Sequence, residues 1–364
     1  MLQSLEALIA DFEAGKLAAL ARAVSIVENH RNGYDELMTR LHAKIGRARR
    51  LGITGPPGAG KSTVTNLIVQ SLRREGLRVG VVAVDPTSPF TGGALLGDRV
   101  RMESVALDPG VYIRSMATRG SLGGLSARTA EVADVLDAFG FDRIIIETVG
   151  VGQTELDIAR TADTTVVVLV PESGDSIQTL KAGVMEIADI FVVNKGDRPG
   201  ADRLRSDIEL MLGLRRGATG NVPAHHGVQL TGLNEKGVGP KSANPMHLAR
   251  KAAWMDNPEE WTPPVLGTTA SKGEGIDILL EAVGRHFRYL EVSGSLKGRR
   301  RRRLRNQVTE VVSERVRSRL WEDAETNAWL EAQLDRLELG SVTPFAVADE
   351  LLRRSGPLLT GVGA

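Results

Sequence analysis

Residues 55–63 read Gly-Pro-Pro-Gly-Ala-Gly-Lys-Ser-Thr and fit the pattern G-x-x-x-x-G-K-[ST]. A largely apolar run at 51–54 precedes this segment, and a helical pattern at 64–69 follows it. A strand, a glycine-rich loop and a helix in this order form a phosphate cradle, because glycines let backbone N–H groups turn inward and a helix amino end attracts anions. A glycine turn with a surface lysine is the plainer alternative, which the flanking context disfavours. The predicted nucleotide-binding residues are Gly55, Pro56, Pro57, Gly58, Ala59, Gly60, Lys61, Ser62 and Thr63.

Two side chains of this loop have a predicted role in phosphate chemistry. Lys61 is expected to reach the β- and γ-phosphates, and we count it among the catalytic residues. The Ser62 hydroxyl is expected to occupy one position around Mg²⁺.

Continuous runs rich in β-branched residues occur at 79–84, 144–146, 165–170 and 190–193. Strands that are apolar on both faces belong to a parallel sheet with helices on both sides. The predicted fold is therefore α/β, a P-loop NTPase with a mostly parallel central sheet covered by helices on both faces. Ligands of such sheets bind beyond the carboxyl ends of the strands, which is where the candidate site residues stand.

Two carboxylates bracket a glycine-rich stretch after the run at 79–84. Asp85 follows the run directly, and Asp98 stands near the far end of the stretch. A long loop with carboxylates at both ends suits a segment that folds over Mg²⁺ and a γ-phosphate. Asp85 and Asp98 are predicted to hold Mg²⁺ directly or through water, and Asp98 also to be catalytic. A helix N-cap remains the alternative for Asp98.

A second acidic element follows the run at 144–146. Glu147 is predicted to be a catalytic residue and a metal ligand, and the N–H of Gly150 to contact the γ-phosphate. Val151 occupies the place where many small GTPases carry a water-orienting glutamine, so Gln153 is the candidate for that role, which the sequence leaves open. Slow unassisted hydrolysis is expected, on the order of 10⁻⁴ to 10⁻² s⁻¹.

The run at 190–193 leads into Asn194-Lys195-Gly196-Asp197, which fits the guanine-reading pattern N-K-x-D. The Asp197 carboxylate can accept hydrogen bonds from guanine N1–H and the 2-amino group, whereas adenine offers neither donor there. A solvated turn is the alternative, and the position after a strand and a phosphate loop disfavours it. Thr269, Ala270 and Ser271 supply a further loop whose N–H groups can meet the guanine oxygen.

Composition argues against nucleic-acid binding, disulfides, thiolate metal sites and membrane insertion. Lys and Arg number 46 against 45 Asp and Glu, a net charge of +1 that gives no general reason to expect nucleic acid. The absence of cysteine excludes disulfides and thiolate metal sites, and the pair His225-His226 has no further ligand nearby in sequence. Without an apolar run of about 18 residues or a signal-peptide pattern, we expect a cytoplasmic protein that does not bind membranes.

Both ends of the chain are predicted to be helical. Apolar residues recur at helical spacing before residue 48, as they do from Leu304 to Leu320. The basic run at 299–303, with Arg305, precedes the second of these patterns. A nucleic-acid arm is one interpretation of this run, and a helix face at a dimer or client contact is the favoured one.

With these residues in hand, the chain resembles a known family, the GTPase chaperones of adenosylcobalamin-dependent acyl-CoA mutases (MeaB/ArgK type, with the methylmalonic aciduria type A protein of animals). The resemblance covers nearly the whole chain. It is carried by GITGPPGAGKST at 52–63, VDPTSPFTGGALLGDRVRM at 84–102, IRSMATRGSLGGLS at 113–126, IIIETVGVGQTE at 144–155, NKGD at 194–197 and KGEGI at 272–276. Residues 216–262 contain no motif by which we can align them with the family.

The resemblance implies a GTP-hydrolysing protein that couples GTP and Mg²⁺ to delivery of adenosylcobalamin to an acyl-CoA mutase, and to protection or reactivation of that mutase. The client would accelerate hydrolysis, a cobalamin adenosyltransferase is a possible further partner, and Lys181 stands in the place of the family's signalling lysine. The implied domains are an N-terminal helical domain at 1–48, a P-loop GTPase domain at 49–290 and a C-terminal helical arm for homodimerisation at 291–364.

Two other functions share parts of this pattern. A GTPase that delivers a metal such as nickel should carry clustered Cys and His, and this chain has no cysteine. A kinase linked to amino-acid transport would need a phosphoacceptor site, for which the sequence gives no support. The sequence does not identify which mutase would be the client.

Overall fold

The structure is a computed structural model, and it describes residues 4–85, 102–117, 127–148, 154–171, 185–215 and 260–356. Asp98, Gly150, Gln153 and Lys181 lie outside these residues, as do residues 216–259 and the side chain of Asp85. The chain divides into two compact units, Met1–Arg299 and Arg300–Ala364.

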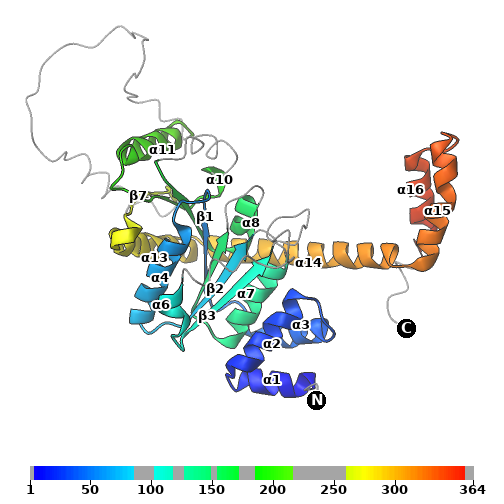
Figure 1. The fold of residues 1–364 in the computed structure, drawn as a ribbon, viewed down its shortest axis with the longest axis horizontal. Coiled ribbons are helices and arrows are strands. Elements are labelled where there is room, and N and C mark those ends of the chain that lie inside the picture. The colour runs from blue at the N-terminus through cyan, green and yellow to red at the C-terminus, as the bar shows by residue number, and fades with distance from the viewer. Residues whose placement is uncertain are drawn as a thin grey trace, which may run out of the picture. The chain divides into compact units, whose positions relative to one another are not determined.

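The first unit is built on a parallel sheet (Figure 1), whose described strands number seven and follow the order β3-β2-β4-β1-β5-β6-β7. Each neighbouring pair is parallel, so the carboxyl ends of all strands meet along one edge. The predicted α/β fold with a central parallel sheet is confirmed. The strands are β1 (Arg49–Thr54), β2 (Val79–Asp85), β3 (Val111–Ala117), β4 (Arg143–Thr148), β5 (Thr164–Leu169), β6 (Ile190–Val193) and β7 (Val265–Gly267).

Alternate residues of the central strands enter different hydrophobic cores on the two faces of the sheet. Val82, Ile144 and Ile146 belong to one core, whereas Val81 and Ile145 belong to the other. This alternation is the two-residue period of extended backbone, and burial on both faces explains why the runs are apolar throughout.

Helices cover both faces of the sheet (Figure 1). On one face, α4 and α13 contribute Ile68 and Leu279 to the core, and on the other, α7 and α8 contribute Leu136 and Ile158. The described helices of this unit are α1 (Leu5–Glu13), α2 (Leu17–Glu28), α3 (Tyr34–Leu41), η1 (His42–Lys44), α4 (Lys61–Arg74), α6 (Glu103–Ala106), α7 (Ala127–Phe139), α8 (Thr154–Thr161), α10 (Met185–Ile187), α11 (Ala201–Arg215), η3 (Ala270–Lys272) and α13 (Ile276–Val292).

The first three helices share a hydrophobic core with the sheet. Leu20 and Leu37 belong to the same cluster of buried residues as Val82 of β2. Polar contacts reinforce this packing, because Asp137 of α7 accepts hydrogen bonds from the N–H groups of Gly46, Arg47 and Ala48 at 2.8, 3.1 and 2.9 Å. The segment between the helices and β1 is thereby held on α7.

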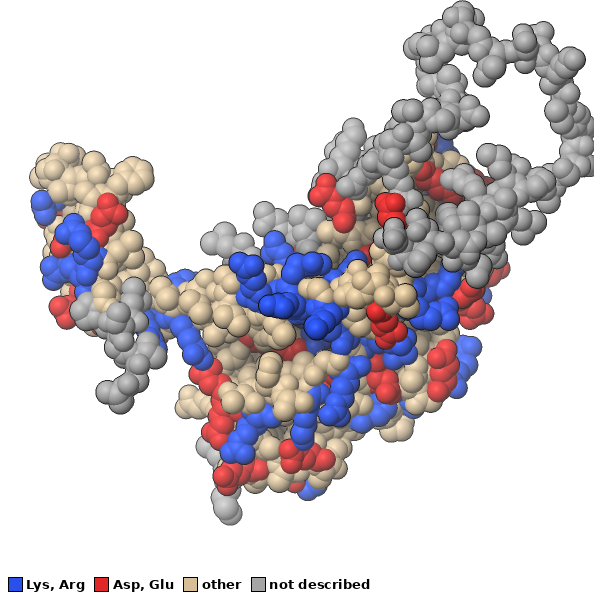
Figure 2. Space-filling view, turned by 180° about the vertical axis from the view of Figure 1, so that it is seen from behind, with Lys and Arg blue, Asp and Glu red and all other residues tan. Residues whose placement is uncertain are grey.

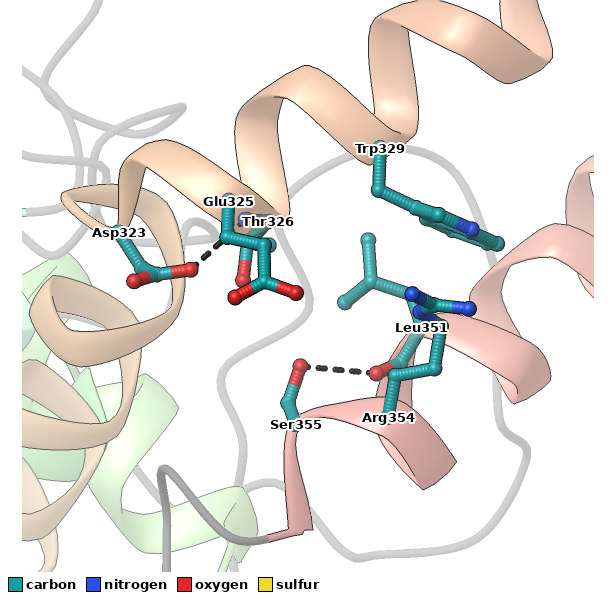
Figure 3. Close-up of a pocket in the computed structure, with 7 residues that line it drawn as sticks. All are labelled: Asp323, Glu325, Thr326, Trp329, Leu351, Arg354 and Ser355. Atoms are coloured by element: carbon teal, nitrogen blue, oxygen red, sulfur yellow. Dashed lines mark hydrogen bonds between the residues drawn. The ribbon is translucent and has the colours of Figure 1, made fainter.

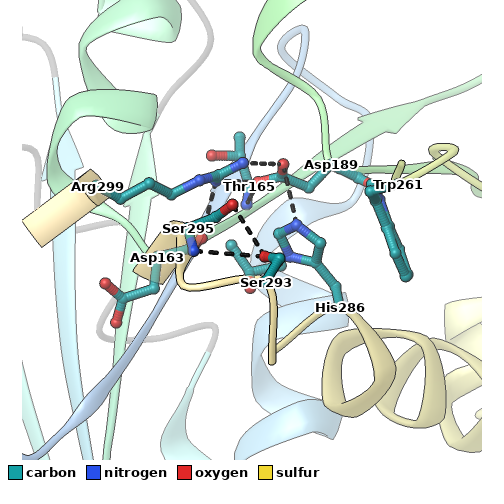
Figure 4. A network of polar contacts seen from close by, with 9 residues as sticks. Asp163, Thr165, Asp189, Trp261, His286, Ser293, Ser295 and Arg299 are labelled. Atoms are coloured by element: carbon teal, nitrogen blue, oxygen red, sulfur yellow. Dashed lines mark hydrogen bonds and ion pairs between the residues drawn. The ribbon is translucent and has the colours of Figure 1, made fainter. Parts of the chain in front are cut away.

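A partly buried network of polar contacts joins the start of α14 (Ser295–Trp321) to the amino ends of two strands (Figure 4). The Arg299 guanidinium donates to Asp189 Oδ1 at 2.7 Å and to Asp189 Oδ2 at 2.8 Å, and also to Asp163 O at 2.9 Å. The Nε2 atom of buried His286 lies 3.3 Å from Asp189 Oδ1. Burial alone would raise the pKa of the Asp189 carboxyl, but the hydrogen bonds and charges of His286 and Arg299 outweigh it and hold that pKa below its ordinary value.

The second unit contains most of α14, followed by α15 (Ala324–Glu338) and α16 (Pro344–Arg354). Thr343 caps α16 by accepting from Ala346 N at 3.2 Å, and Pro344 is the first residue of this helix. Between α15 and α16 lies an open pocket of about 500 Å³ (Figure 3), in which the Arg354 guanidinium lies 5.2 Å from the centre of the Trp329 ring. The pocket is lined by Asp323, Glu325, Thr326, Trp329, Leu351, Arg354 and Ser355.

An apolar stripe runs along α14 with a four-residue spacing. Leu304, Val308, Val312 and Val316 are exposed to 47, 63, 53 and 40 %. Side chains four residues apart share one face of a helix, so these four form a continuous apolar strip on the described chain.

Charges of both signs are spread over the face of the molecule seen in Figure 2. Figure 2 shows Lys and Arg side chains gathered over the middle of this face, with Asp and Glu side chains around them. Among the helices of the described ranges, none combines the length and the apolar composition that crossing a bilayer requires.

Candidate functional site

The loop between β1 and α4 depends on glycine at two places. Gly55 has a φ of +137°, and a Cβ there would lie 2.0 Å from Val168 O of β5. Gly60 has a φ of +85°, and a Cβ there would lie 2.5 Å from Asn194 Nδ2. Only glycine tolerates both the backbone conformation and the close approach, so these positions fix the shape of the loop.

The loop leads directly into the amino end of α4. Gly60 is the N-cap of this helix, and no side chain of the described residues caps it. The N–H groups of a first helical turn have no acceptor within the helix, and the helix dipole places about half a positive charge there. Together with the turned backbone of the loop, this helix end offers the N–H donors and the partial positive charge that an anion requires.

The side chains of Lys61 and Ser62 stand at this helix end. Lys61 is 7 % exposed, and its Nζ donates to Gly55 O at 2.8 Å and to Pro56 O at 2.9 Å. Ser62 is equally buried, and its Oγ donates to Glu147 Oε1 at 2.6 Å. The sheet therefore brings the predicted metal ligands from the loop and from β4 into direct contact.

Asn194 joins the phosphate loop to the two loops that follow β6 and β7. Its Nδ2 donates to Ala59 O at 2.8 Å, across 135 residues of sequence. Its Oδ1 accepts from Thr268 Oγ1 at 3.0 Å and from Ala270 N at 3.1 Å. Asn194 is 3 % exposed, so these are buried hydrogen bonds that hold the loops together.

The rest of the N-K-G-D segment is more exposed. Lys195 has a φ of +56°, which turns the chain sharply after β6. The next N–H, of Gly196, donates to Thr268 O at 2.9 Å. The Asp197 side chain is 41 % exposed, and its Oδ2 lies 3.3 Å from Lys272 Nζ.

The loop after β7 is closed by a pair of backbone hydrogen bonds. Thr269 N donates to Glu274 O at 3.1 Å, and Glu274 N donates to Thr269 O at 3.3 Å. Within this loop Ser271 is exposed, whereas the Ala270 N–H, expected to face a guanine oxygen, is engaged by Asn194.

The described residues thus bring together, at one edge of the sheet, most of the residues that the sequence singled out. Asp85 is the last residue of β2, in register with Ala117 of β3, and its side chain is outside the described part. The predicted roles of Asp98, Gly150, Gln153 and Lys181 fall on residues that the structure does not describe.

The donor set at this edge suits Mg²⁺ bound together with a phosphate. Within the described ranges no three His, Asp or Glu side chains converge on a possible metal site. Mg²⁺ commonly binds one or two protein oxygens, keeps several waters and takes its other ligands from substrate phosphates. The Ser62 hydroxyl and the Glu147 carboxylate, in contact at the amino end of α4, fit that requirement.

Two features of the site were missed in the sequence. Thr148 Oγ1 donates to Thr54 Oγ1 at 2.8 Å, which links the carboxyl ends of β4 and β1. The available signal was a threonine at the end of the run at 51–54 and another two residues after the run at 144–146. The contact between Lys272 and Asp197 was also missed, because nothing in the spacing of the two residues indicates it.

Comparison with known proteins identifies the family. A family model described as "Methylmalonyl Co-A mutase-associated GTPase MeaB" matches residues 20–325. A protein of Pyrococcus abyssi is 42 % identical over 349 residues, covering 96 % of each chain. The mouse protein "Methylmalonic aciduria type A homolog, mitochondrial" is 31 % identical over 357 residues, covering 93 % of this chain and 76 % of its own.

Among solved structures, one titled "Crystal structure of LAO/AO transport system kinase" has the same fold. It gives a TM-score of 0.61 at 24 % identity, covering 97 % of this chain and 99 % of its own. The match of the family model over most of the chain, together with a fold and loops that suit a nucleoside triphosphate, shows that the chain belongs to the MeaB family of methylmalonyl Co-A mutase-associated GTPases.

Proposed function

We propose that the protein binds GTP with Mg²⁺ at the carboxyl edge of the sheet and hydrolyses it as a chaperone of an adenosylcobalamin-dependent acyl-CoA mutase. The observation that carries the nucleotide assignment is the position of the Asn194 side chain. It forms hydrogen bonds both to Ala59 of the phosphate loop and to Ala270 of the loop after β7. A phosphate cradle and a base-reading segment held in one frame suit a ligand with both phosphates and a base.

In this proposal, guanine is recognised by Asn194, Lys195 and Asp197, with Thr269, Ala270 and Ser271 closing the base pocket. The phosphates lie on the backbone of residues 55–63, with Lys61 turning from the loop carbonyls toward their oxygens. Asp197 selects guanine because its carboxylate can accept from two donors that adenine lacks.

Hydrolysis requires water to form a bond to the γ-phosphorus while the bond from that phosphorus to the β–γ bridging oxygen breaks, giving GDP and inorganic phosphate. Lys61 and the first-turn N–H groups of α4 stabilise the negative charge on the phosphate oxygens. Bound Mg²⁺ supplies further charge neutralisation, with Ser62, Glu147, Asp85 and Asp98 as its proposed ligands or water-mediated partners. Gln153 and the Gly150 N–H are proposed to orient the water and the γ-phosphate.

The mutase partner is proposed from the family description, which names association with methylmalonyl Co-A mutase. Lys181 is proposed to report nucleotide state to that client, and a cobalamin adenosyltransferase is a further proposed partner. The apolar strip of α14 supports homodimerisation through residues 291–364, since an exposed strip of this kind is typical of an association surface. We place this activity in the cytoplasm.

Phosphate release from GTP by the full-length chain tests the activity. Lys61→Ala should lower the rate by about 10²-fold or more, because a charge-stabilising donor is lost. Lys16→Ala removes a surface lysine that pairs with Asp11 at 2.6 Å and should leave the rate unchanged. Equal rates for wild type and Lys61→Ala would remove the phosphate-loop role.

Two further measurements separate the alternatives. With γ-labelled GTP, label in free phosphate supports a GTPase, whereas label on the protein would support a kinase. Co-purification with a candidate acyl-CoA mutase in the presence of a non-hydrolysable GTP analogue tests the chaperone role. No association with any such mutase, in either nucleotide state, would contradict that role and leave the GTPase activity standing.

A further inference from the structure

The proposed base-reading carboxylate has a cationic partner that no part of the nucleotide pattern predicts. Asp197 Oδ2 lies 3.3 Å from Lys272 Nζ, and the two side chains are 41 % and 55 % exposed. Lys272 is the last residue of η3 and comes from a different loop, after β7 rather than after β6.

The backbone around Lys272 is held firmly. Lys272 N donates to Thr269 O at 2.9 Å, and the paired N–H groups of Thr269 and Glu274 close the loop around it. Gly275 has a φ of +81°, and a Cβ there would lie 2.5 Å from Gly267 O, so the loop is packed directly against the end of β7. The lysine therefore projects from a fixed base rather than from a freely moving loop.

Asp197 is attached to the same frame. Gly196 N donates to Thr268 O at 2.9 Å, and Thr268 N donates to Val193 O at 2.9 Å. Asn194, three residues before Asp197, accepts from both Thr268 and Ala270. The two partners of the ion pair thus stand on backbones that are hydrogen-bonded to each other within a few residues.

We propose that Lys272 is a positioning residue for guanine recognition, which holds the Asp197 carboxylate in the orientation that meets both donor groups of the base. The proposal rests on the proposed GTP site. One cation on Oδ2 leaves the second oxygen and the remaining lone pair of Oδ2 for the base, since a carboxylate offers about four acceptor positions. An exposed aspartate without such a partner would sample several rotamers and lose part of its two-donor contact.

The test compares affinities of the full-length chain for GDP and IDP in the presence of Mg²⁺, measured by calorimetry. Inosine keeps N1–H and lacks the 2-amino group, so it can make only one of the two contacts with Asp197. Lys272→Met keeps the length of the side chain without its charge, and it should weaken GDP binding by about two- to fivefold while changing IDP binding less. The ratio of the affinity for GDP to the affinity for IDP should therefore fall. A merely structural effect would lower both affinities alike.

Three further variants complete the test. Lys272→Arg retains the charge and should restore most of the ratio. Lys44→Met removes a comparable surface ion pair, with Glu13 at 2.7 Å on the N-terminal helices, and should leave both affinities unchanged. In an Asp197→Asn background, Lys272→Met should have no further effect on GDP, because the carboxylate through which it acts is gone.

The failures of the two proposals are distinguishable. If Asp197→Asn weakens GDP binding but Lys272→Met changes neither the affinity nor the ratio, the positioning role is wrong and the base-reading role stands. An equal loss from Lys272→Met in both backgrounds also overturns the positioning role. If Asp197→Asn itself leaves GDP binding unchanged, the proposed guanine site is wrong.

Discussion

Arg299 and Asp189, 110 residues apart, form an ion pair through two hydrogen bonds of 2.7 and 2.8 Å. The same carboxylate accepts from Thr165 N at 2.8 Å, and the Asp189 carbonyl accepts from Trp261 Nε1 at 2.8 Å. One residue in front of β6 therefore connects β5, the segment that leads to β7, and the first part of α14 (Figure 4).

Replacing this carboxylate should destabilise the first unit. Asp189→Asn removes the charged acceptor of the partly buried Arg299 guanidinium, which keeps its hydrogen bond to Asp163 O. We expect a loss of about 2–3 kcal/mol in the free energy of unfolding, the usual cost for a hydrogen-bonded charge that loses its partner. Urea unfolding followed by circular dichroism measures it. Glu36→Gln, which breaks an exposed pair with Arg40 at 3.7 Å, serves as the control and should leave the midpoint in place.

The same carboxylate should make stability depend on acid. Its folded-state pKa lies below its ordinary value, whereas an unfolded aspartate titrates near pH 3.9. The unfolded state therefore binds the proton more readily, and the stabilisation from Asp189 is complete above about pH 4 and lost as the pH falls through the folded-state pKa. Between pH 5 and 3, urea midpoints should fall more steeply for wild type than for Asp189→Asn. Parallel curves would contradict this assignment.

Gly55 should not tolerate a side chain. Gly55→Ala places a Cβ 2.0 Å from Val168 O, so the phosphate loop must move away from β5. We expect weaker GDP binding together with a loss of stability of more than about 2 kcal/mol, since both the left-handed conformation and the clash add to the cost. Gly15→Ala also has a positive φ, of +77°, but nothing lies within 4 Å of the added Cβ. It should cost only about 1 kcal/mol and leave nucleotide affinity unchanged.

The apolar strip of α14 should control self-association. Val308→Asp and Val312→Asp each place a charge in the middle of the strip and should shift a dimer toward monomer in sedimentation velocity at micromolar concentration. Thr309→Asp, on the adjacent face of the same helix, adds the same charge beside the strip and should have a smaller effect. A single monomeric species for wild type would show that this strip does not join two copies.

The arrangement of the sheet could be predicted from its strands. Runs such as 166–170 and 190–193 are apolar throughout because both faces of each strand are buried, and this signal is local in sequence. The glycine loop and the N-K-G-D segment were recognisable for the same reason, since each is contiguous and each directly follows a strand.

Contacts between distant residues could not be predicted. Arg50 lies in the first strand, where a charge argues against burial, yet it is 2 % exposed because Asp134 of α7 accepts from it at 2.5 Å. Asp189 and Arg299 likewise gave no signal, since an acidic residue before a strand and a basic residue in a basic run are usually solvated. Such pairs are defined by the packing of helices on the sheet, and one sequence does not determine which charge meets which.

β6 contains only four residues. Asp189, which pairs with Arg299, directly precedes it, and Asn194, which joins the loops by hydrogen bonds, directly follows it. An extended strand of this length spans about 13 Å and can be neither stretched nor shortened much. A displacement of Arg299 is therefore expected to be transmitted through Asp189 and along β6 to the turn at 194–197. The nucleotide release rate of Asp189→Asn, compared with that of wild type, would measure the strength of this coupling.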